Sequence, residues 1–262
     1  MILAAFRSEW VKLRRRTLLL GTFGGLTVAA SLFSVLTFSQ APATGEGGGG
    51  LPSLAELARP NGLIHGLDFA ILLLGIVAFG IAASQMANEY SLGTLRQLLV
   101  RQPRRSKLLI GKYLGVISFL VAAIAVAAVL TGCVDVLLAH LRHVPTHAWF
   151  TSTGITDLTR ALGELLLASV GFATLGMVAG LFLRSSVFAV IVGFAYLLPL
   201  EQLIERIFPG SKRWLPGQQL TYIGQGGAPA SSFSRSLLIG AIYLAVAGAF
   251  AVYSFTRRDV TA

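Results

Sequence analysis

Charged residues are scarce in this chain of 262 residues: aspartate, glutamate, lysine and arginine make up only 12% of the sequence, whereas hydrophobic residues make up 55%. Soluble domains contain about 25% charged residues, so an ordinary soluble enzyme is excluded. The single cysteine, Cys133, has no second cysteine with which to form a disulfide within the chain. The packing of apolar segments therefore has to hold the fold together.

The chain also lacks a phosphate-binding loop. Such a loop needs glycines at a fixed spacing and a lysine followed by serine or threonine. Here Lys112 is followed by Tyr113, and Ser106 stands where the first glycine would be. We expect no ATP site, no catalytic residue and no cofactor on this chain.

A metal site is also not expected. Three histidines share a spacing that suits metal ligands, namely His140, His143 and His147. Pro145 interrupts a helix between the last two, and no cysteine or paired carboxylate completes a ligand set. We interpret the histidines as solvated side chains at a membrane boundary.

Six long apolar segments are the main feature that is present. A helix that crosses a bilayer needs about 20 apolar residues. The segments cover residues 18–38, 67–87, 108–133, 161–183, 187–200 and 237–255. They predict an all-α polytopic membrane protein with six transmembrane helices in one transmembrane domain over residues 1–262.

The 21 basic residues are distributed unevenly between the segments that connect these spans. If the N-terminus is cytoplasmic, 14 of them lie in the inner segments 1–17, 88–112, 184–186 and 256–262. The positive-inside rule then places both termini in the cytoplasm of a multi-pass cell-membrane protein. The formal charge of +10 is thus explained by anionic lipid rather than by nucleic acid.

The first apolar segment has a second interpretation as a signal peptide, because basic residues precede it and small residues follow. Signal peptides have apolar cores of about 7 to 15 residues, and residues 18–38 exceed that length. We expect a retained membrane anchor.

Residues 1–17 alternate apolar and basic side chains at helical spacing. Phe6 and Trp10 suit the headgroup boundary, while Arg7 and Lys12 can reach anionic lipid. This pattern predicts an amphipathic helix in the membrane interface. An orientation signal without a mechanical role fits the same residues equally well.

The inner segment 88–112 is longer than a connector needs to be. Its apolar face carries Leu92, Leu95 and Leu99, and another face carries Glu89, Gly93 and Arg96. Pro103 then stops a helix. Glycine weakens a helix by about 1 kcal/mol relative to alanine but lets another surface approach closely, so we expect this cytoplasmic helix to dock a second protein.

Residues 89–96 read E-Y-S-L-G-T-L-R, and residues 104–112 read R-R-S-K-L-L-I-G-K. Both resemble the E-Y-x-x-G-T-L-R and R-x-x-L-L-x-G-K segments of type-2 ATP-binding-cassette (ABC) exporter permeases. The opening R-S-E-W-V-K-L-R of residues 7–14 is similar to the basic start of that family.

The resemblance implies a permease whose cytoplasmic coupling helix between spans two and three contacts a separate ABC ATPase. The implied contact residues are Glu89, Tyr90, Gly93, Thr94 and Arg96. ATP and magnesium would bind the partner, and a second permease copy or a homologue would complete the translocation path.

Three acidic residues near expected outer helix ends are candidate substrate or gate contacts: Asp135, Glu201 and Glu205. Solvated helix ends are the alternative interpretation. Residues 201–235 contain two Pro-Gly pairs and are expected to form short helices broken by turns, which is a candidate gate. The GxxxG pairs Gly21/Gly25 and Gly176/Gly180 serve either packing within the chain or a dimer contact.

We expect an exporter permease rather than an enzyme. The substrate class left open covers a hydrophobic drug, a lipid or a peptide antibiotic, with multidrug or antibiotic resistance as one outcome. An ATP-independent transporter would need charged or discontinuous helices at mid-membrane. An intramembrane enzyme would need catalytic residues that converge within the bilayer, and no such set is seen in the sequence.

Overall fold

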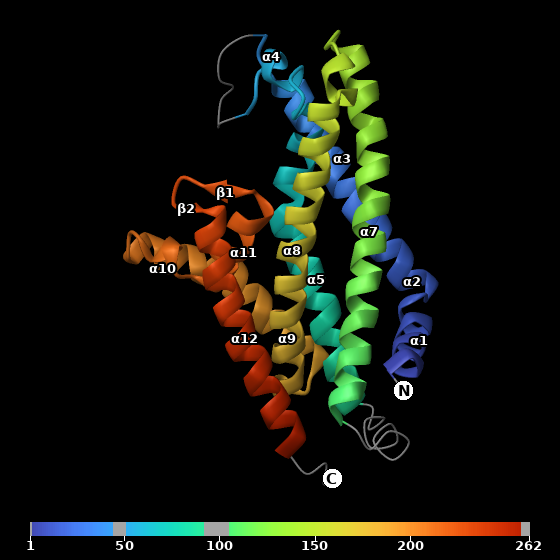
Figure 1. Ribbon diagram of the computed structural model, residues 1–262, viewed down its shortest axis with the longest axis vertical. Helices are drawn as coiled ribbons and strands as arrows, with labels where there is room; N and C mark the ends of the chain where they lie inside the picture. The colour runs from blue at the N-terminus through green and yellow to red at the C-terminus, as the bar shows by residue number, and fades with distance from the viewer. Residues whose placement is uncertain (1, 44–50, 92–104, 258–262) are drawn as a thin grey trace.

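The computed structural model describes residues 2–43, 51–91 and 105–257. Within these ranges nearly every segment is helical, and the long helices run roughly side by side in one elongated bundle (Figure 1). The all-α expectation is confirmed, apart from one two-stranded ladder of two residues per strand.

The first half of the chain forms a short helix, a bent first long helix and two more long helices. Its elements are α1 (Ile2–Leu13), α2 (Arg16–Leu19), the π-turn η1 (Leu20–Gly24), α3 (Gly25–Gln40), α4 (Leu54–Leu57), the 3-10 turn η2 (Gly62–Ile64), α5 (His65–Ser91) and α7 (Arg105–Leu141). The π-turn makes α2, η1 and α3 one continuous path through Leu20–Gly24.

The second half contains a long helix that pairs with α7, a segment of short helices and a last long helix. Its elements are η3 (His147–Phe150), α8 (Ser152–Leu183), α9 (Ser186–Ala195), η4 (Tyr196–Leu200), α10 (Glu201–Ile207), η5 (Ser211–Arg213), α11 (Pro216–Gly224), β1 (Gly227–Ala228), β2 (Ser231–Ser232) and α12 (Phe233–Arg257). The expected short helices after residue 200 are present as α10, η5 and α11.

Five described helices are long and apolar enough to cross a membrane: Arg16–Gln40, Lys107–Leu141, Ser152–Leu183, Ser186–Ile207 and Phe233–Tyr253. The expected second span lies in α5, whose apolar stretch among the described residues is Leu73–Glu89. Large apolar side chains are exposed on the outer faces of these helices, for example Val129, Leu238 and Val246. Such a surface suits lipid rather than water.

Two helices are longer than expected. The third expected span stops at residue 133, but α7 continues to Leu141, and α8 begins at Ser152 instead of residue 161. The apolar run and the helix need not end together, because helix ends depend on local capping. Thr151 provides the cap for α8 by accepting a hydrogen bond from the Gly154 N–H.

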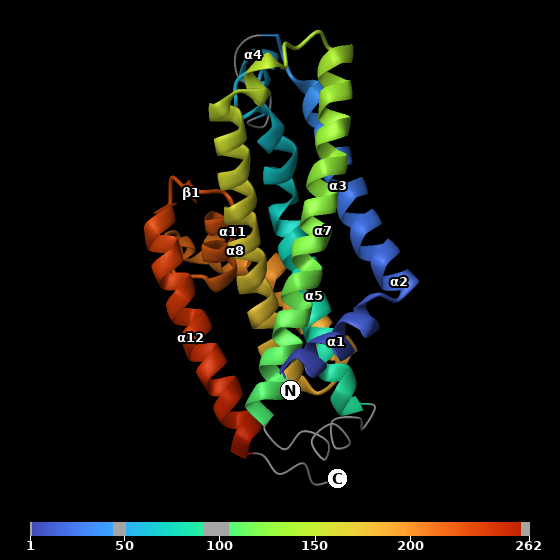
Figure 2. The ribbon, with the colours of Figure 1, turned by 45° about the vertical axis from the view of Figure 1, so that its right-hand side comes forward.

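The long helices define two ends of the bundle. Helix α1, the end of α5, the beginning of α7 and the end of α12 lie together, and we name this the α1 end (Figures 1 and 2). The opposite end carries α4 and the turn between α7 and α8, and we name it the α4 end. Helix α12 begins partway along α8, beside β2, and runs to the α1 end.

Helices α5 and α8 form the central pair, and two glycines set their separation. A Cβ at Gly176 would lie 2.2 Å from the Phe79 carbonyl oxygen, and one at Gly180 would lie 2.3 Å from the Ala83 carbonyl oxygen. This GxxxG pair therefore packs within the chain. The other pair differs, since a Cβ at Gly21 or Gly25 would meet no atom within 4 Å.

Candidate functional site

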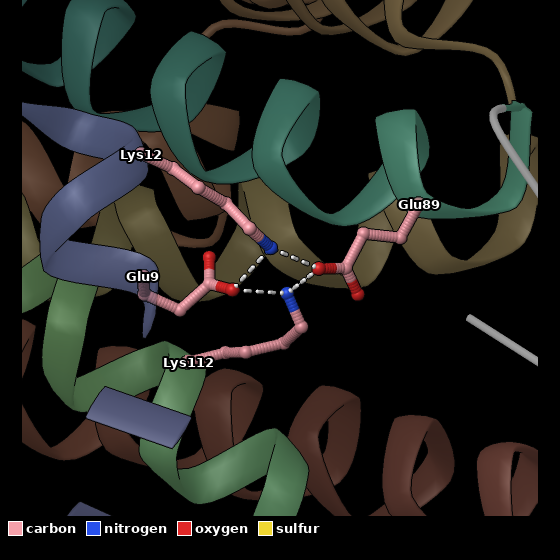
Figure 3. A network of polar contacts seen from close by, with 4 residues as sticks. All are labelled: Glu9, Lys12, Glu89 and Lys112. Carbon is pink, nitrogen blue, oxygen red and sulfur yellow. Dashed lines mark hydrogen bonds and ion pairs between the residues drawn. The ribbon is translucent and has the colours of Figure 1, made fainter. Parts of the chain in front are cut away.

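Four charged side chains from three elements meet at the α1 end. Glu9 and Lys12 come from α1, Glu89 lies near the end of α5, and Lys112 lies near the beginning of α7 (Figure 3). We call these four residues the charge network. It holds two positive and two negative charges, so its formal net charge is zero.

The contacts alternate in sign around a closed ring. The Lys12 ammonium donates to Glu9 Oε1 and to Glu89 Oε1, each at 2.8 Å. The Lys112 ammonium donates to Glu9 Oε1 at 2.9 Å and also to Glu89 Oε1. Each lysine therefore bridges both carboxylates.

Burial makes this pairing necessary. The Glu9, Glu89 and Lys112 side chains are between 2% and 5% exposed, whereas Lys12 reaches the surface with 37% of its side chain exposed. A buried ion pays a desolvation penalty of several kcal/mol unless an opposite charge and hydrogen bonds compensate it. The second oxygens, Glu9 Oε2 and Glu89 Oε2, are buried without a hydrogen-bond partner among the described residues.

The network favours the charged forms of its members on α1. Burial alone would raise the pKa of Glu9, but the ammonium groups of Lys112 and Lys12 outweigh it and hold that pKa below its ordinary value. Burial would lower the pKa of Lys12, but the two carboxylates outweigh it and raise that pKa. Both side chains are therefore ionised at neutral pH.

The sequence of α1 explains why it docks here. Glu9 and Lys12 are three residues apart and so share a helix face, while Leu13 is fully buried beside them. The Trp10 ring meets Phe119 of α7 edge-on at 6.2 Å. On α7, Gly115 allows the approach, because a Cβ there would lie 2.8 Å from the Glu9 Cβ.

The predicted N-terminal helix is present as α1, and its position in the membrane interface stays a prediction. Phe6 stacks on Trp10 at 6.2 Å, and Arg7 is exposed. The Trp10 ring is half-buried and packs on the bundle, and its expected place at the headgroup boundary stays a prediction. Lys12 was expected to reach lipid and instead belongs to the charge network.

The predicted ATPase contacts are only partly described. Glu89 was expected on an exposed face, and this is wrong: the residue is 4% exposed and both lysines hold its carboxylate. Helix α5 continues through Tyr90 to Ser91. Gly93, Thr94 and Arg96 lie outside the described residues, as does the rest of the predicted coupling helix up to residue 99.

The three acidic candidates for substrate contact do not form a common site. Asp135 is 1% exposed inside α7, and neither carboxylate oxygen has a hydrogen-bond partner among the described residues. The buried Thr131 hydroxyl also makes no hydrogen bond within this part of the chain, whereas the Ser34 hydroxyl lies close to the Asp135 carboxylate. The alternative interpretation of Asp135 as a solvated helix end is wrong, because the residue is buried and α7 continues past it to Leu141.

Glu201 and Glu205 have structural partners. Glu201 is buried, and its Oε1 accepts the Gly217 backbone N–H at 2.8 Å. This carboxylate therefore caps the N-terminus of α11, where Leu215 supplies no side-chain cap. Glu205 pairs with Lys212 at 2.5 Å.

Sequence reasoning missed Glu9 and Lys112 as site residues. One signal was available, since each lies in a segment that carries the family resemblance. Among the described residues, no group of three or more histidine, cysteine, aspartate or glutamate side chains is placed to hold a metal ion.

Comparisons with known proteins place the chain in a family. No curated protein matches it. Residues 53–261 match the model of the family described as "Protein of unknown function (DUF2705)", and the chain therefore belongs to that family.

Proposed function

We propose that the chain is the permease subunit of a type-2 ABC exporter in the cell membrane. In this proposal α5 joins the five candidate spans as the sixth, and the α1 end with both termini faces the cytoplasm. A separate ABC ATPase supplies the energy with ATP and magnesium, and a second permease copy or a homologue completes the translocation path. The substrate is a hydrophobic or amphipathic compound such as a drug, a lipid or a peptide antibiotic.

One observation carries this proposal. The three sequence segments that resemble the exporter permeases each contribute to the charge network: residues 7–14 supply Glu9 and Lys12, residues 89–96 supply Glu89, and residues 104–112 supply Lys112. Segments up to 103 residues apart in the chain are joined there by buried contacts. This supports the interpretation that the three segments act together as one functional unit.

The charge network also suggests how movement of the ATPase could be transmitted to the membrane helices. Glu89 and Lys112 lie on either side of residues 92–104, and both are tied to α1. A force applied to that segment by a closing ATPase would move the end of α5, the beginning of α7 and α1 together. In this scheme Gly93, Thr94 and Arg96 contact the ATPase, whereas Glu89 holds the end of α5 to α1 and α7.

The proposal is tested by looking for an ABC ATPase gene beside the gene for this chain and by co-expressing the two proteins. We expect the two proteins to co-purify in detergent and the ATPase rate to change when both are reconstituted in nanodiscs. Gly93→Val should weaken co-purification without lowering the thermal stability of the permease, because it alters only the partner contact. Glu89→Gln should lower stability and coupling together.

Gly48→Val, in the connection between the first two spans, serves as the matched control for the glycine substitution. The proposal fails if no ABC ATPase co-purifies, or if Gly93→Val and Glu89→Gln both retain the ATPase and its wild-type rate. Loss of binding in Gly48→Val as well would show a general folding defect rather than a lost contact, and would also overturn the assignment of Gly93.

The unpartnered Asp135 carboxylate favours a second candidate, an ATP-independent, cation-driven transporter. Ionisable groups buried within membrane helices commonly mark ion pathways. This candidate requires substrate movement in proteoliposomes driven by a proton or sodium gradient without any ATPase, and requires Asp135→Asn to abolish it. If the substrate moves only when the ATPase and ATP are present, the result favours the exporter over the cation-driven transporter.

A further inference from the structure

An apolar groove with a volume of about 390 Å³ lies between α7, α8 and α12. Leu109 and Tyr113 of α7, Met177 and Leu181 of α8, and Leu244 and Val252 of α12 are among its walls. It therefore occupies the part of the bundle that leads to the α1 end, where the beginning of α7 and the end of α12 come together (Figure 2).

Small residues on α12 create the hollow. Ala245, Gly248 and Ala251 recur every three residues and line the groove, so they share one helix face. A Cβ added at Gly248 would meet no atom within 4 Å. The glycine therefore faces open space rather than a close neighbour.

The polar groups in the wall are already satisfied by each other. The Tyr113 and Thr174 hydroxyl oxygens lie 2.6 Å apart, and Thr174 Oγ1 donates to the Val170 carbonyl oxygen at 2.8 Å. Tyr113 is then the donor to Thr174, and both hydroxyl protons are used. The wall therefore offers a ligand no free hydroxyl proton, and apart from these two hydroxyls its side chains are apolar. A strongly polar ligand would lose most of its hydration here without replacement, so the groove favours a hydrocarbon.

The size of the groove decides what kind of hydrocarbon it is. Its volume lies near the lower end of the range of about 300–1,000 Å³ for small-molecule pockets and is comparable to one lipid acyl chain. A helix of a second copy has a diameter of about 10 Å with its side chains, so roughly one turn of it would already fill this volume. One extended chain fits.

The basic residues in the sequence at the ends of two of these helices indicate the headgroup. Helix α7 begins at Arg105 and continues with Lys107, and α12 ends at Arg257. Both helix ends lie at the α1 end of the bundle, and the lining residues nearest to them in the sequence are Leu109 and Val252. Basic residues near a membrane surface attract anionic lipid by about 1 kcal/mol each.

The geometry points to a binding site for one anionic phospholipid of the surrounding leaflet, with one acyl chain in the groove and the phosphate at the cationic ends of α7 and α12. The site goes beyond the proposed exporter function and does not depend on it, since a bound lipid requires neither ATP nor a partner. Its occupancy would fix the distance between α12 and the α7–α8 hairpin.

The site is tested with the full chain in phosphatidylcholine nanodiscs that contain a trace of phosphatidylglycerol with a photoactivatable acyl chain. We expect labelling to concentrate on peptides that contain residues 109–113 and 244–252. Gly248→Leu fills the groove and should lower this labelling on the order of tenfold, because each methylene displaced changes affinity about fourfold. Gly132→Leu is the matched control, since Gly132 of α7 also faces open space, outside the groove lining.

Three further measurements keep the proposal falsifiable. Ala245→Leu, at an exposed residue of the lining, should reproduce the loss if Gly248→Leu fails to fold. A phosphatidylcholine probe should label the groove less than phosphatidylglycerol, and added salt should shrink that difference. Equal labelling by both headgroups, uniform labelling of all lipid-facing peptides, or unchanged labelling in both filled variants overturns the site.

Discussion

The α1 end and the α4 end of the bundle are closed by different chemistry. At the α1 end, four charges from α1, α5 and α7 bind one another. At the α4 end, an apolar cluster that includes Phe38, Leu57 and Trp149 packs together, and the Trp149 indole N–H donates to the Leu57 carbonyl oxygen at 2.8 Å.

This difference assigns the two ends different mechanical roles. A ring of ion pairs depends on every member, because removing one leaves an uncompensated charge. Packing of apolar side chains tolerates changes in pH and salt. The α4 end is therefore a fixed clamp, whereas the α1 end responds to charge and is the end that a second protein can move.

The largest effect is expected at the clamp. Trp149→Ala removes a side chain that is 1% exposed and leaves the Leu57 carbonyl without its donor. Truncations of a buried tryptophan destabilise by about 3–5 kcal/mol, and an orphaned buried acceptor adds about 1–3 kcal/mol. The free energy of unfolding, measured by SDS titration in mixed micelles, should fall by at least the first of these amounts.

Trp149→Phe is the matched variant, because it keeps one aromatic ring and most of the packing but removes the indole N–H together with part of the bicyclic ring. It should lose substantially less than Trp149→Ala. If the two variants are equally stable, packing at this position contributes little and the clamp is held by something else.

The charge network should show the next largest effect. Lys112→Met leaves two buried carboxylates with only Lys12 between them, and breaking a buried pair from one side costs about 3 kcal/mol or more. Adding Glu89→Gln removes one of the two like charges and should restore part of the loss. Unfolding of the single and double variants in the same micelles provides the double-mutant cycle.

Arg7→Met controls for the loss of a basic residue near the network, since Arg7 of α1 is exposed and is not a network member. It should stay close to wild-type stability. A double variant that is no more stable than Lys112→Met would mean that Glu89 and Lys112 are not coupled.

The sequence predicts the positions of the long helices better than their ends. Apolar run length is a local property, so each of the six expected spans falls within the described helical segments. The extension of α8 back to Ser152 depends on the Thr151 cap, and α7 continues through the buried polar Asp135. A hydropathy pattern predicts neither the cap nor the continuation of the helix through a buried polar residue.

The candidate site was less predictable than the helices, because most of its contacts join residues that are far apart in the sequence. Only the Glu9–Lys12 pair is local, three residues apart. Glu89 is 77 residues from Lys12, and the capping of α11 by Glu201 spans 16 residues. Such pairs depend on how helices pack, and no helical periodicity encodes them.

A third prediction compares the two charged residues buried on α7. Lys112 is paired, whereas Asp135 has no hydrogen-bond partner for either oxygen among the described residues. Asp135→Asn keeps the shape, removes the charge and offers an N–H to the nearby Ser34 hydroxyl. We expect stability to rise by about 1 kcal/mol, measured in the same SDS titration.

Asp157→Asn in α8, a half-buried aspartate of the other long helix, is the control and should change stability by less. A clear loss of stability in Asp135→Asn would show that the ionised carboxylate has a partner that stabilises it, and would strengthen the case for a bound cation.

The smallest effect concerns pH, and it separates the two ends directly. The ammonium groups hold the folded-state pKa of Glu9 below its ordinary value, so the unfolded state binds more protons as the pH falls. The stability that Glu9 contributes is therefore fully present above the ordinary glutamate pKa of about 4.3 and is lost as the pH falls through the folded-state pKa. The difference in unfolding free energy between the wild type and Glu9→Gln should be constant near neutral pH and shrink below about pH 4.

The difference between wild type and Trp149→Phe should not follow this curve, because no charge is involved. If the Glu9→Gln difference stays constant throughout acidification, or if Trp149→Phe shows the same pH dependence, the contrast between a charge-responsive end and a fixed clamp is wrong.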